Sequence, residues 1–212
     1  MTVDGTNAQY VVSNNCGNIS INNTTINAGS NANQFAFDVC GYAKYTAGVT
    51  VTVSGTSVIN GKVEISKSAG NTELMKLNIT SGTFNGDLKV DASVGTENAQ
   101  SIISVSGGTF SDPSVLKYMA TNATVDIKLL SNINIAKTEL ATGYILNAAN
   151  ATANLNLNGH DIINSSETAD ATPFTQIFTV QNGTLNISGN GNVKCDASAT
   201  RSEERRVGKE CR

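Results

Sequence analysis

A short alternating stretch that ends in glycine recurs along this chain at nearly regular intervals. Residues 103–110 read Ile-Ser-Val-Ser-Gly-Gly-Thr-Phe, and related stretches lie at 51–56, 77–84 and 178–185. The threonine after the glycine stands at positions 56, 83, 109 and 184, so the first two steps are nearly equal and the last is close to three such steps. Apolar residues at alternate positions indicate half-buried strands. A fixed period of roughly two dozen residues is typical of a solenoid.

The composition suits a protein made of many short strands and tight corners. Asparagine, threonine, serine and glycine are plentiful, and hydrophobic residues make up 39% of the 212 residues. These polar residues form turns, and Val, Ile, Leu and Ala supply the core. Charged residues are sparse at 15% and the net charge is −3, so we expect neither nucleic acid nor an anionic membrane as a partner.

Residues 48–66 carry the clearest pattern. Val49, Val51 and Val53 share one face, and two further apolar pairs follow, separated by glycine corners. Three strands and their corners in one period are what a single turn of a parallel β-helix requires, because alternate side chains then point into its interior. Residues 112–120 break the rhythm: Asp112 can cap a helix and Pro113 suits its first position. We therefore expect an all-β fold, a parallel β-helix with one short helix near 112–120.

The chain divides into three parts by pattern. Residues 1–120 are expected to form parallel β-helix turns that end in the short helix, and residues 121–200 a continuing or second β-helix unit that is truncated. Residues 201–212 hold five basic residues and no strand pattern. They resemble a translated sequencing adapter, so we expect a non-native, disordered tail.

The start at Met1 lacks the basic and apolar segments of a signal peptide, and no apolar run reaches the length of a membrane span. We interpret the chain as a fragment of a longer protein.

Several phrases carry a resemblance to a known class of proteins. Residues 105–114, 127–133, 155–162 and 185–191 resemble the right-handed parallel β-helix repeats of large surface proteins of gut bacteria. The resemblance implies a structural or binding segment of a secreted, adhesin-like protein at the cell surface, with glycans or surface proteins as partners. Similar phrases occur in phage structural proteins, so a virion decoration or fibre protein is the alternative. A polysaccharide lyase or hydrolase is the third interpretation, and the resemblance carries over no catalytic residue.

Five residues are candidates for ligand binding. Tyr42, Tyr45 and Tyr144 could stack on sugars, whereas packing in the core or at a corner is the structural alternative that their surroundings favour. Asp87 and Asp91 flank Lys89 and could form the paired carboxylates of a glycan-cleaving enzyme, whereas solvated charges are the structural alternative. Among the other acids, Asp38, Glu64 and Glu73 are interpreted as isolated. We expect no catalytic residues.

The remaining polar motifs predict no metal and no cofactor. Cys16 and Cys40 lie about one period apart, so either a disulfide or two free thiols would fit. His160 is the single histidine and is expected at a corner, which argues against zinc. Outward asparagines between apolar positions predict side-chain amide ladders along the stack, at Asn78, Asn156 and Asn186.

Overall fold

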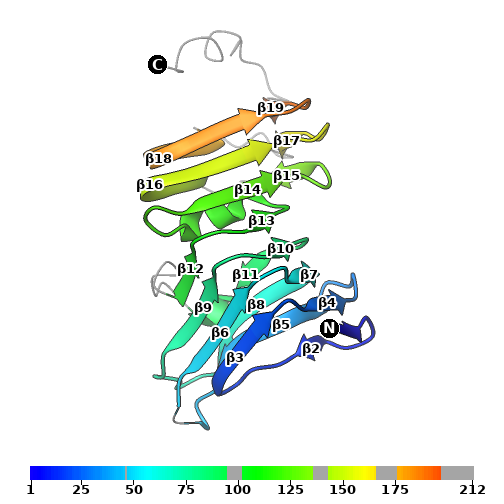
Figure 1. Cartoon of the computed structure of the whole chain (residues 1–212), viewed down its shortest axis with the longest axis vertical. Coiled ribbons are helices and arrows are strands. Elements are labelled where there is room, and N and C mark those ends of the chain that lie inside the picture. Colours follow the sequence, from blue (N-terminus) through cyan, green and yellow to red (C-terminus); the bar gives the residue numbers. More distant parts are fainter. Residues whose placement is uncertain (46, 95–101, 136–142, 166–175, 197–212) are drawn as a thin grey trace.

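The computed structural model describes residues 1–45, 47–94, 102–135, 143–165 and 176–196 (Figure 1). Most of them belong to β-strands, and the strand pairings in the described part are parallel. The expectation of an all-β protein built from parallel sheets is therefore confirmed. The expected adapter-like tail at 201–212 lies outside the described residues. Among the described helices, none is long and apolar enough to cross a membrane.

The strands of the described residues form four sheets. Sheet A has the order β1 (Thr2–Gly5), β4 (Thr25–Ala28), β7 (Val58–Asn60), β10 (Thr83–Phe84), β13 (Thr109–Phe110), β14 (Thr124–Lys128), β16 (Tyr144–Asn156), β18 (Phe178–Ser188). Sheet B has the order β11 (Leu88–Val90), β8 (Lys62–Lys67), β5 (Phe35–Gly41), β2 (Tyr10–Val12). Sheet C has the order β12 (Ile103–Val105), β9 (Met75–Ile79), β6 (Val49–Ser54), β3 (Gly17–Asn22). Sheet D has the order β15 (Ile133–Ile135), β17 (Ile162–Ser165), β19 (Val193–Asp196).

The chain visits these sheets in a repeated order. From β1 to β12 each strand of sheet A is followed by one of sheet B and then one of sheet C. From β14 onward, strands of sheets A and D alternate. Figure 1 shows the strands stacked as successive levels along the long axis of the molecule. Sheet A runs through all levels, including both parts of the chain that the sequence separates at residue 120.

Alternation along each strand explains the core. Val49, Val51 and Val53 of β6 are at most 1% exposed, whereas the threonines between them lie half-buried on the outer face. In the next strand Leu77 pairs with Val51, and Ile79 with Val53. Like side chains thus stack in columns inside the molecule, and each fully buried aliphatic side chain stabilises the fold by about 1.5–3 kcal/mol.

The predicted short helix is present as a 3₁₀-helix. It is η2 (Pro113–Tyr118), and the Asp112 side chain accepts a hydrogen bond from the Ser114 N–H at 2.6 Å, as the capping pattern predicts. A second 3₁₀-helix, η1 (Ala92–Val94), was not expected. η2 stands between β13 and β14, where the earlier levels carry a strand of sheet B.

The strand register in sheet A corrects the predicted repeat at two of its four threonines, Thr56 and Thr184. Thr83 pairs with Thr109, as predicted. However, Thr83 pairs with Val58 and not with Thr56, so Thr56 is out of register. Thr184 pairs with Thr152 and is likewise displaced, because the levels that follow Thr109 differ in length from the earlier ones. The corners differ in length from level to level, so a threonine that lies in or near a corner does not keep the same register position in each level.

Asparagine owes part of its abundance to the corners. Non-glycine residues with positive φ among the described residues are asparagines: Asn23, Asn122, Asn150 and Asn158. Asparagine tolerates this left-handed conformation better than most residues. Asn122 and Asn150 occupy matching corners of successive levels, and the Asn150 side chain donates to that of Asn122 at 3.2 Å.

Candidate functional site

The outer face of sheet A carries a continuous column of short polar side chains, which we call the outer column. Its members are consecutive register partners: Thr2, Thr25, Val58, Thr83, Thr109, Asp126, Asn154 and Asn186. Neighbouring strands lie about 4.8 Å apart, so the column presents one hydroxyl, amide or carboxylate at nearly every step of that length. Asn186 donates to Asn154 at 2.9 Å and Asn154 donates to Asp126 at 3.0 Å, which confirms the predicted ladder at Asn186.

A shallow, open groove, here the first groove, lies along the N-terminal ends of β7, β10, β13 and β14. Its lining residues are Gly55, Thr56, Val58, Ser81, Gly82, Thr83, Gly108, Thr109, Thr124 and Asp126. Gly82 and Gly108 have φ of +114° and +120°, and an added Cβ would lie 3.0 Å from the carbonyl oxygen of Ser57 or of Gly82. Glycine therefore keeps the groove floor low, and threonine and serine hydroxyls line its sides.

A second shallow groove lies at the C-terminal ends of β4, β7 and β10. Its lining residues are Ala28, Gly29, Ser30, Asn60, Gly61, Lys62, Asn85, Gly86 and Asp87. Beneath it, Asn85 donates to Asn60 and Asn60 donates to Asn27, each at 2.8 Å. This second groove therefore borders an amide ladder that the sequence did not single out.

The predicted pair Asp87 and Asp91 is divided between two environments. Asp87 lines the second groove, where desolvation and the nearby Asp112 carboxylate raise the pKa of its exposed side chain and Lys62 lowers it. Asp91 accepts the Ser93 N–H at 2.8 Å at the start of η1, and this hydrogen bonding lowers the pKa of Asp91. Asp91 thus serves a turn at the far end of β11 from Asp87.

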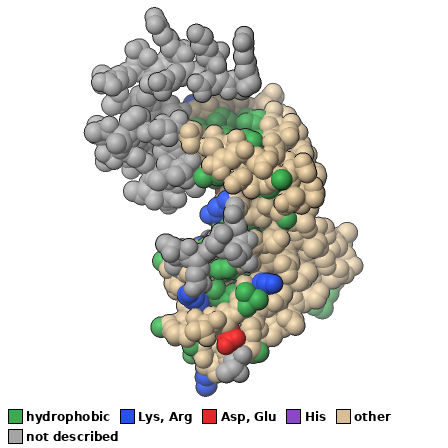
Figure 2. Space-filling view, turned by 90° about the vertical axis from the view of Figure 1, so that its left-hand side faces the viewer, with side chains coloured by type: hydrophobic (Ala, Val, Ile, Leu, Met, Phe, Trp, Pro, Cys, Tyr) green, Lys and Arg blue, Asp and Glu red, His purple; other side chains and the backbone are tan. Residues whose placement is uncertain are grey.

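The three candidate tyrosines also differ in position. Tyr144 is 7% exposed and packs on Phe178 of the next strand, with ring centroids 5.5 Å apart, so it belongs to the core. Tyr42 and Tyr45 are each 43% exposed at the corner between β5 and β6, and their ring centroids lie 5.7 Å apart with a tilt of 43°. Neutral side chains and backbone form most of the described surface seen in Figure 2.

Cys16 and Cys40 are free thiols. Cys16 is exposed just before β3, and Cys40 is half-buried on β5. Desolvation raises the pKa of Cys40, and the nearby carboxylates of Asp38 and Glu64 add to this rise, while a hydrogen bond with Ser66 lowers it. The sequence left open either a disulfide or two free thiols at these positions, and the structure has two free thiols.

A pair of buried carboxylates was missed by the sequence interpretation, which treated Asp38 and Glu64 as isolated. The two are register partners on β5 and β8, and they are 4% and 8% exposed. Tyr10 donates its hydroxyl to Glu64 at 2.5 Å, and the Asn14 N–H donates to Asp38 at 2.8 Å. The signal in the sequence was the spacing of the two acids, which equals one period of the repeat.

Burial of this carboxylate pair predicts a pH effect on stability. Desolvation raises the pKa of Asp38 above its ordinary value of 3.8, against the lowering effect of the hydrogen bonds from Asn14 and Ser13, and the neighbouring Glu64 raises it further. The folded state then binds the Asp38 proton more tightly than the unfolded chain does. The contribution of Asp38 to the free energy of unfolding is therefore most favourable below its ordinary pKa. It is lost as pH rises through the raised pKa of the folded state.

We therefore expect the free energy of unfolding of the wild type to fall, relative to that of Asp38→Asn, as pH rises from 3.8 towards neutrality. Urea denaturation of both proteins across this range measures the difference. Asparagine keeps a side-chain oxygen for the Asn14 N–H. A difference that stays constant or rises with pH would contradict the assignment.

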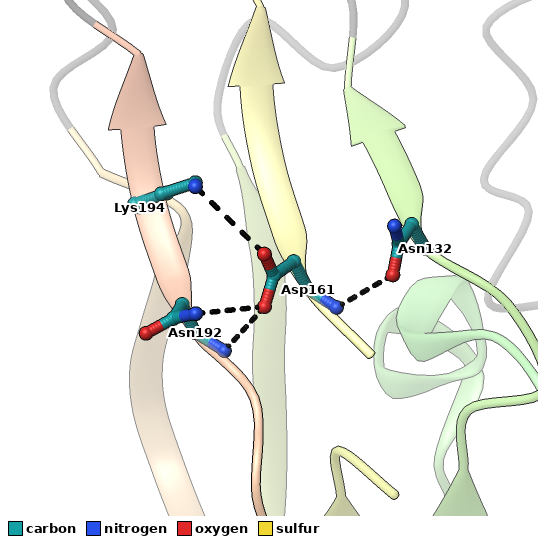
Figure 3. Close-up of polar contacts among 4 residues, drawn as sticks. All are labelled: Asn132, Asp161, Asn192 and Lys194. Atoms are coloured by element: carbon teal, nitrogen blue, oxygen red, sulfur yellow. Dashed lines mark hydrogen bonds and ion pairs between the residues drawn. The ribbon is translucent and has the colours of Figure 1, made fainter. Parts of the chain in front are cut away.

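A further asparagine and aspartate ladder fixes the corner beside His160 (Figure 3). The Asp161 N–H donates to the Asn132 side chain at 3.0 Å, and Asp161 Oδ1 accepts from the backbone and side chain of Asn192 at 2.8 and 2.9 Å. Lys194 Nζ lies 3.7 Å from Asp161 Oδ2. The bonds from Asn192 and the charge of Lys194 lower the pKa of Asp161. This carboxylate is committed to structure, and His160 lies at a turn, as expected.

Comparison with known proteins adds no relative. No protein-family model matches the chain, and no curated protein or solved structure matches it. Within the described residues, no group of three or more His, Cys, Asp or Glu side chains could hold a metal ion. The strongest candidate surface is therefore the outer face of sheet A with its two grooves.

Proposed function

We propose that this chain is a segment of a right-handed parallel β-helix from a secreted, adhesin-like surface protein, and that it binds glycans along the outer face of sheet A. The repeated order of sheets A, B and C and the parallel register between levels support the winding. Right-handed connection is the rule for parallel strands joined by crossovers. The extracellular location and a role in contacts with glycans or surface proteins belong to the same proposal.

The observation that carries the binding role is the lining of the first groove. Its side chains end in hydroxyls at Thr56, Ser81, Thr83, Thr109 and Thr124, with the one carboxylate of Asp126. A polyhydroxyl ligand can exchange hydrogen bonds with such groups, whereas a phosphate or sulfate would meet no lysine or arginine in this lining. Uncharged polysaccharides are therefore the class of ligand that this surface suits.

The grooves favour binding over cleavage. Hydrolysis of a glycosidic bond usually takes two carboxylates that flank it, and each groove has one, Asp126 or Asp87. In addition, Asp126 Oδ1 accepts a hydrogen bond from the Asn154 side chain, so this carboxylate oxygen is already part of the ladder. A repeated row of weak contacts suits a long ligand that lies along the stack, because its successive units meet equivalent side chains.

Removing hydroxyls from the groove is expected to weaken glycan binding. Thr83→Val and Thr109→Val keep the branched shape that favours a strand but lose one hydrogen-bonding group each, so each should weaken binding about two- to tenfold. Isothermal titration against neutral polysaccharides such as β-glucan, xylan and mannan measures the affinity.

The matched control is Thr52→Val, on the outer face of β6 in sheet C and away from both grooves. It should bind as the wild type does. Failure of every polysaccharide in the panel to bind, or equal binding by the groove variants and the control, would refute the proposed role.

A further inference from the structure

Three threonine side chains in the first groove have hydroxyls that bond to no other described residue. They are Thr83 on β10, Thr109 on β13 and Thr124 on β14, and each is half-buried or exposed. We call these three residues the free threonines. Each of their hydroxyls keeps both its donor and its acceptor capacity for a ligand.

Other hydroxyls of the same groove are already engaged. Thr56 Oγ1 donates to the Asn23 side chain at 3.1 Å, and Ser81 Oγ donates to the carbonyl oxygen of Gly55 at 3.0 Å. These two side chains hold the corner between neighbouring levels together. The full hydrogen-bonding capacity of the groove is therefore concentrated in the free threonines.

The free threonines stand in three consecutive levels of sheet A. Thr83 is the register partner of Thr109, and Thr124 lies on the next strand, two residues before Asp126, the partner of Thr109. Levels follow one another at about 4.8 Å, so these hydroxyls span about 10 Å along the stack. No level contains two of them, so a ligand that contacts all three runs along the stack and not along one strand.

We propose that the ligand of the first groove is an extended, neutral β-1,4-linked glycan that lies along the stack, with successive sugars on successive levels. This inference rests on the proposed function of the groove and names its ligand more narrowly. In an extended β-1,4-linked chain each pyranose unit advances by close to the spacing of one level, so its hydroxyls stay in step with the free threonines. Chains linked β-1,3 or α-1,4 coil, so their successive units turn away from a straight row.

The length of the groove sets the length of the ligand. The lining residues reach from β7 to β14, which is four levels or about 14 Å, so about four sugar units fit. Each unit added up to that number should raise the affinity about two- to tenfold, as one further hydrogen bond would. Further units should add less, because Asn154 and Asn186 on the following levels are bonded to each other.

Isothermal titration of the full chain with oligosaccharides of two to six units tests linkage and length together. The β-1,4 probes are cello-, manno- and xylo-oligosaccharides, and the comparison probes are β-1,3-linked laminari- and α-1,4-linked malto-oligosaccharides. At least one β-1,4 series should bind, with an affinity that rises to about four units and then levels off. The comparison probes of equal length should bind about tenfold more weakly or not at all.

Two valine variants test the direction in which the ligand lies. Thr83→Val and Thr124→Val stand two levels apart, and both should weaken binding of the best tetrasaccharide about two- to tenfold. Thr124→Ser keeps the hydroxyl and should bind as the wild type does, which separates hydrogen bonding from strand shape. Thr52→Val, on the outer face of sheet C, is again the matched control. A loss in only one of the two valine variants would mean that the ligand lies along a strand, and the inference would be wrong.

The outcomes also separate this inference from the proposed function. Equal affinity for β-1,4 and β-1,3 probes, or affinity that does not rise with length, would overturn the inference and leave glycan binding in place. Binding of long polysaccharides without binding of any oligosaccharide would do the same. Failure of every oligosaccharide and every polysaccharide to bind would refute both.

Discussion

Replacing Phe84 by alanine is expected to lower the free energy of unfolding by about 3–5 kcal/mol. Phe84 is 1% exposed, and its ring stacks on that of Phe110 with centroids 5.1 Å apart and planes 13° from parallel. It pairs with Ile59 on the other side, so its loss leaves a cavity between two levels of the stack. Close-packed interiors relax only partly around such a cavity, and this keeps the cost high.

Urea denaturation of wild type and variant measures this loss as a shift of the midpoint. Phe84→Leu should cost less than alanine does, because leucine refills part of the volume. Tyr45→Ala is the exposed aromatic control and should change stability by less than about 0.5 kcal/mol. A Phe84→Ala protein as stable as this control would show that the stacking of Phe84 between Ile59 and Phe110 does not hold the levels together.

Substituting Gly61 by alanine is expected to cost about 3–5 kcal/mol, since two penalties act together. Gly61 has φ of +130°, a region that side chains other than glycine rarely adopt. An added Cβ would also lie 2.6 Å from the Cβ of Ala28 on the level below. The turn between β7 and β8 would have to move away from its neighbour, and the amide ladder beside it would be disturbed.

Gly17→Ala separates the two penalties. Gly17 also has positive φ, +85°, but an added Cβ there meets nothing within 4 Å. The expected cost is therefore the conformational one alone, about 1–2 kcal/mol. Equal losses for the two variants in thermal or urea unfolding would mean that contact between neighbouring corners contributes nothing.

The strands could be predicted from sequence because their periodicity is local. Alternating valines at 49, 51 and 53 specify the inner face of β6, and the structure buries all three. Asp112 and Pro113 specify the start of η2 by the chemistry of a helix cap, which also acts within a few residues. Such signals lie within a few residues of each other, so they can be recognised from the sequence alone.

The register and the candidate site depended on distant contacts, and there the sequence was a weaker guide. Thr56 looked equivalent to Thr83 because a glycine precedes both, yet β7 begins only at Val58, after the corner that follows Gly55. The buried acids of β5 and β8 became neighbours only once the level length was known. Tyr144 lies in the core because the Phe178 ring of the next level packs on it, and no local sequence pattern specifies this contact.

The level that contains η2 has a mechanical consequence. Sheet B ends at β11 and sheet D begins at β15. Among the described residues, the pairings that cross from β12 and β13 to the next level are therefore the short register of β13 with β14 and the isolated bridge of Val105 to Met119. Tension along the long axis would be borne there by fewer backbone hydrogen bonds than between the flanking levels. The protein should yield first at this seam, leaving the parallel sheets on either side intact.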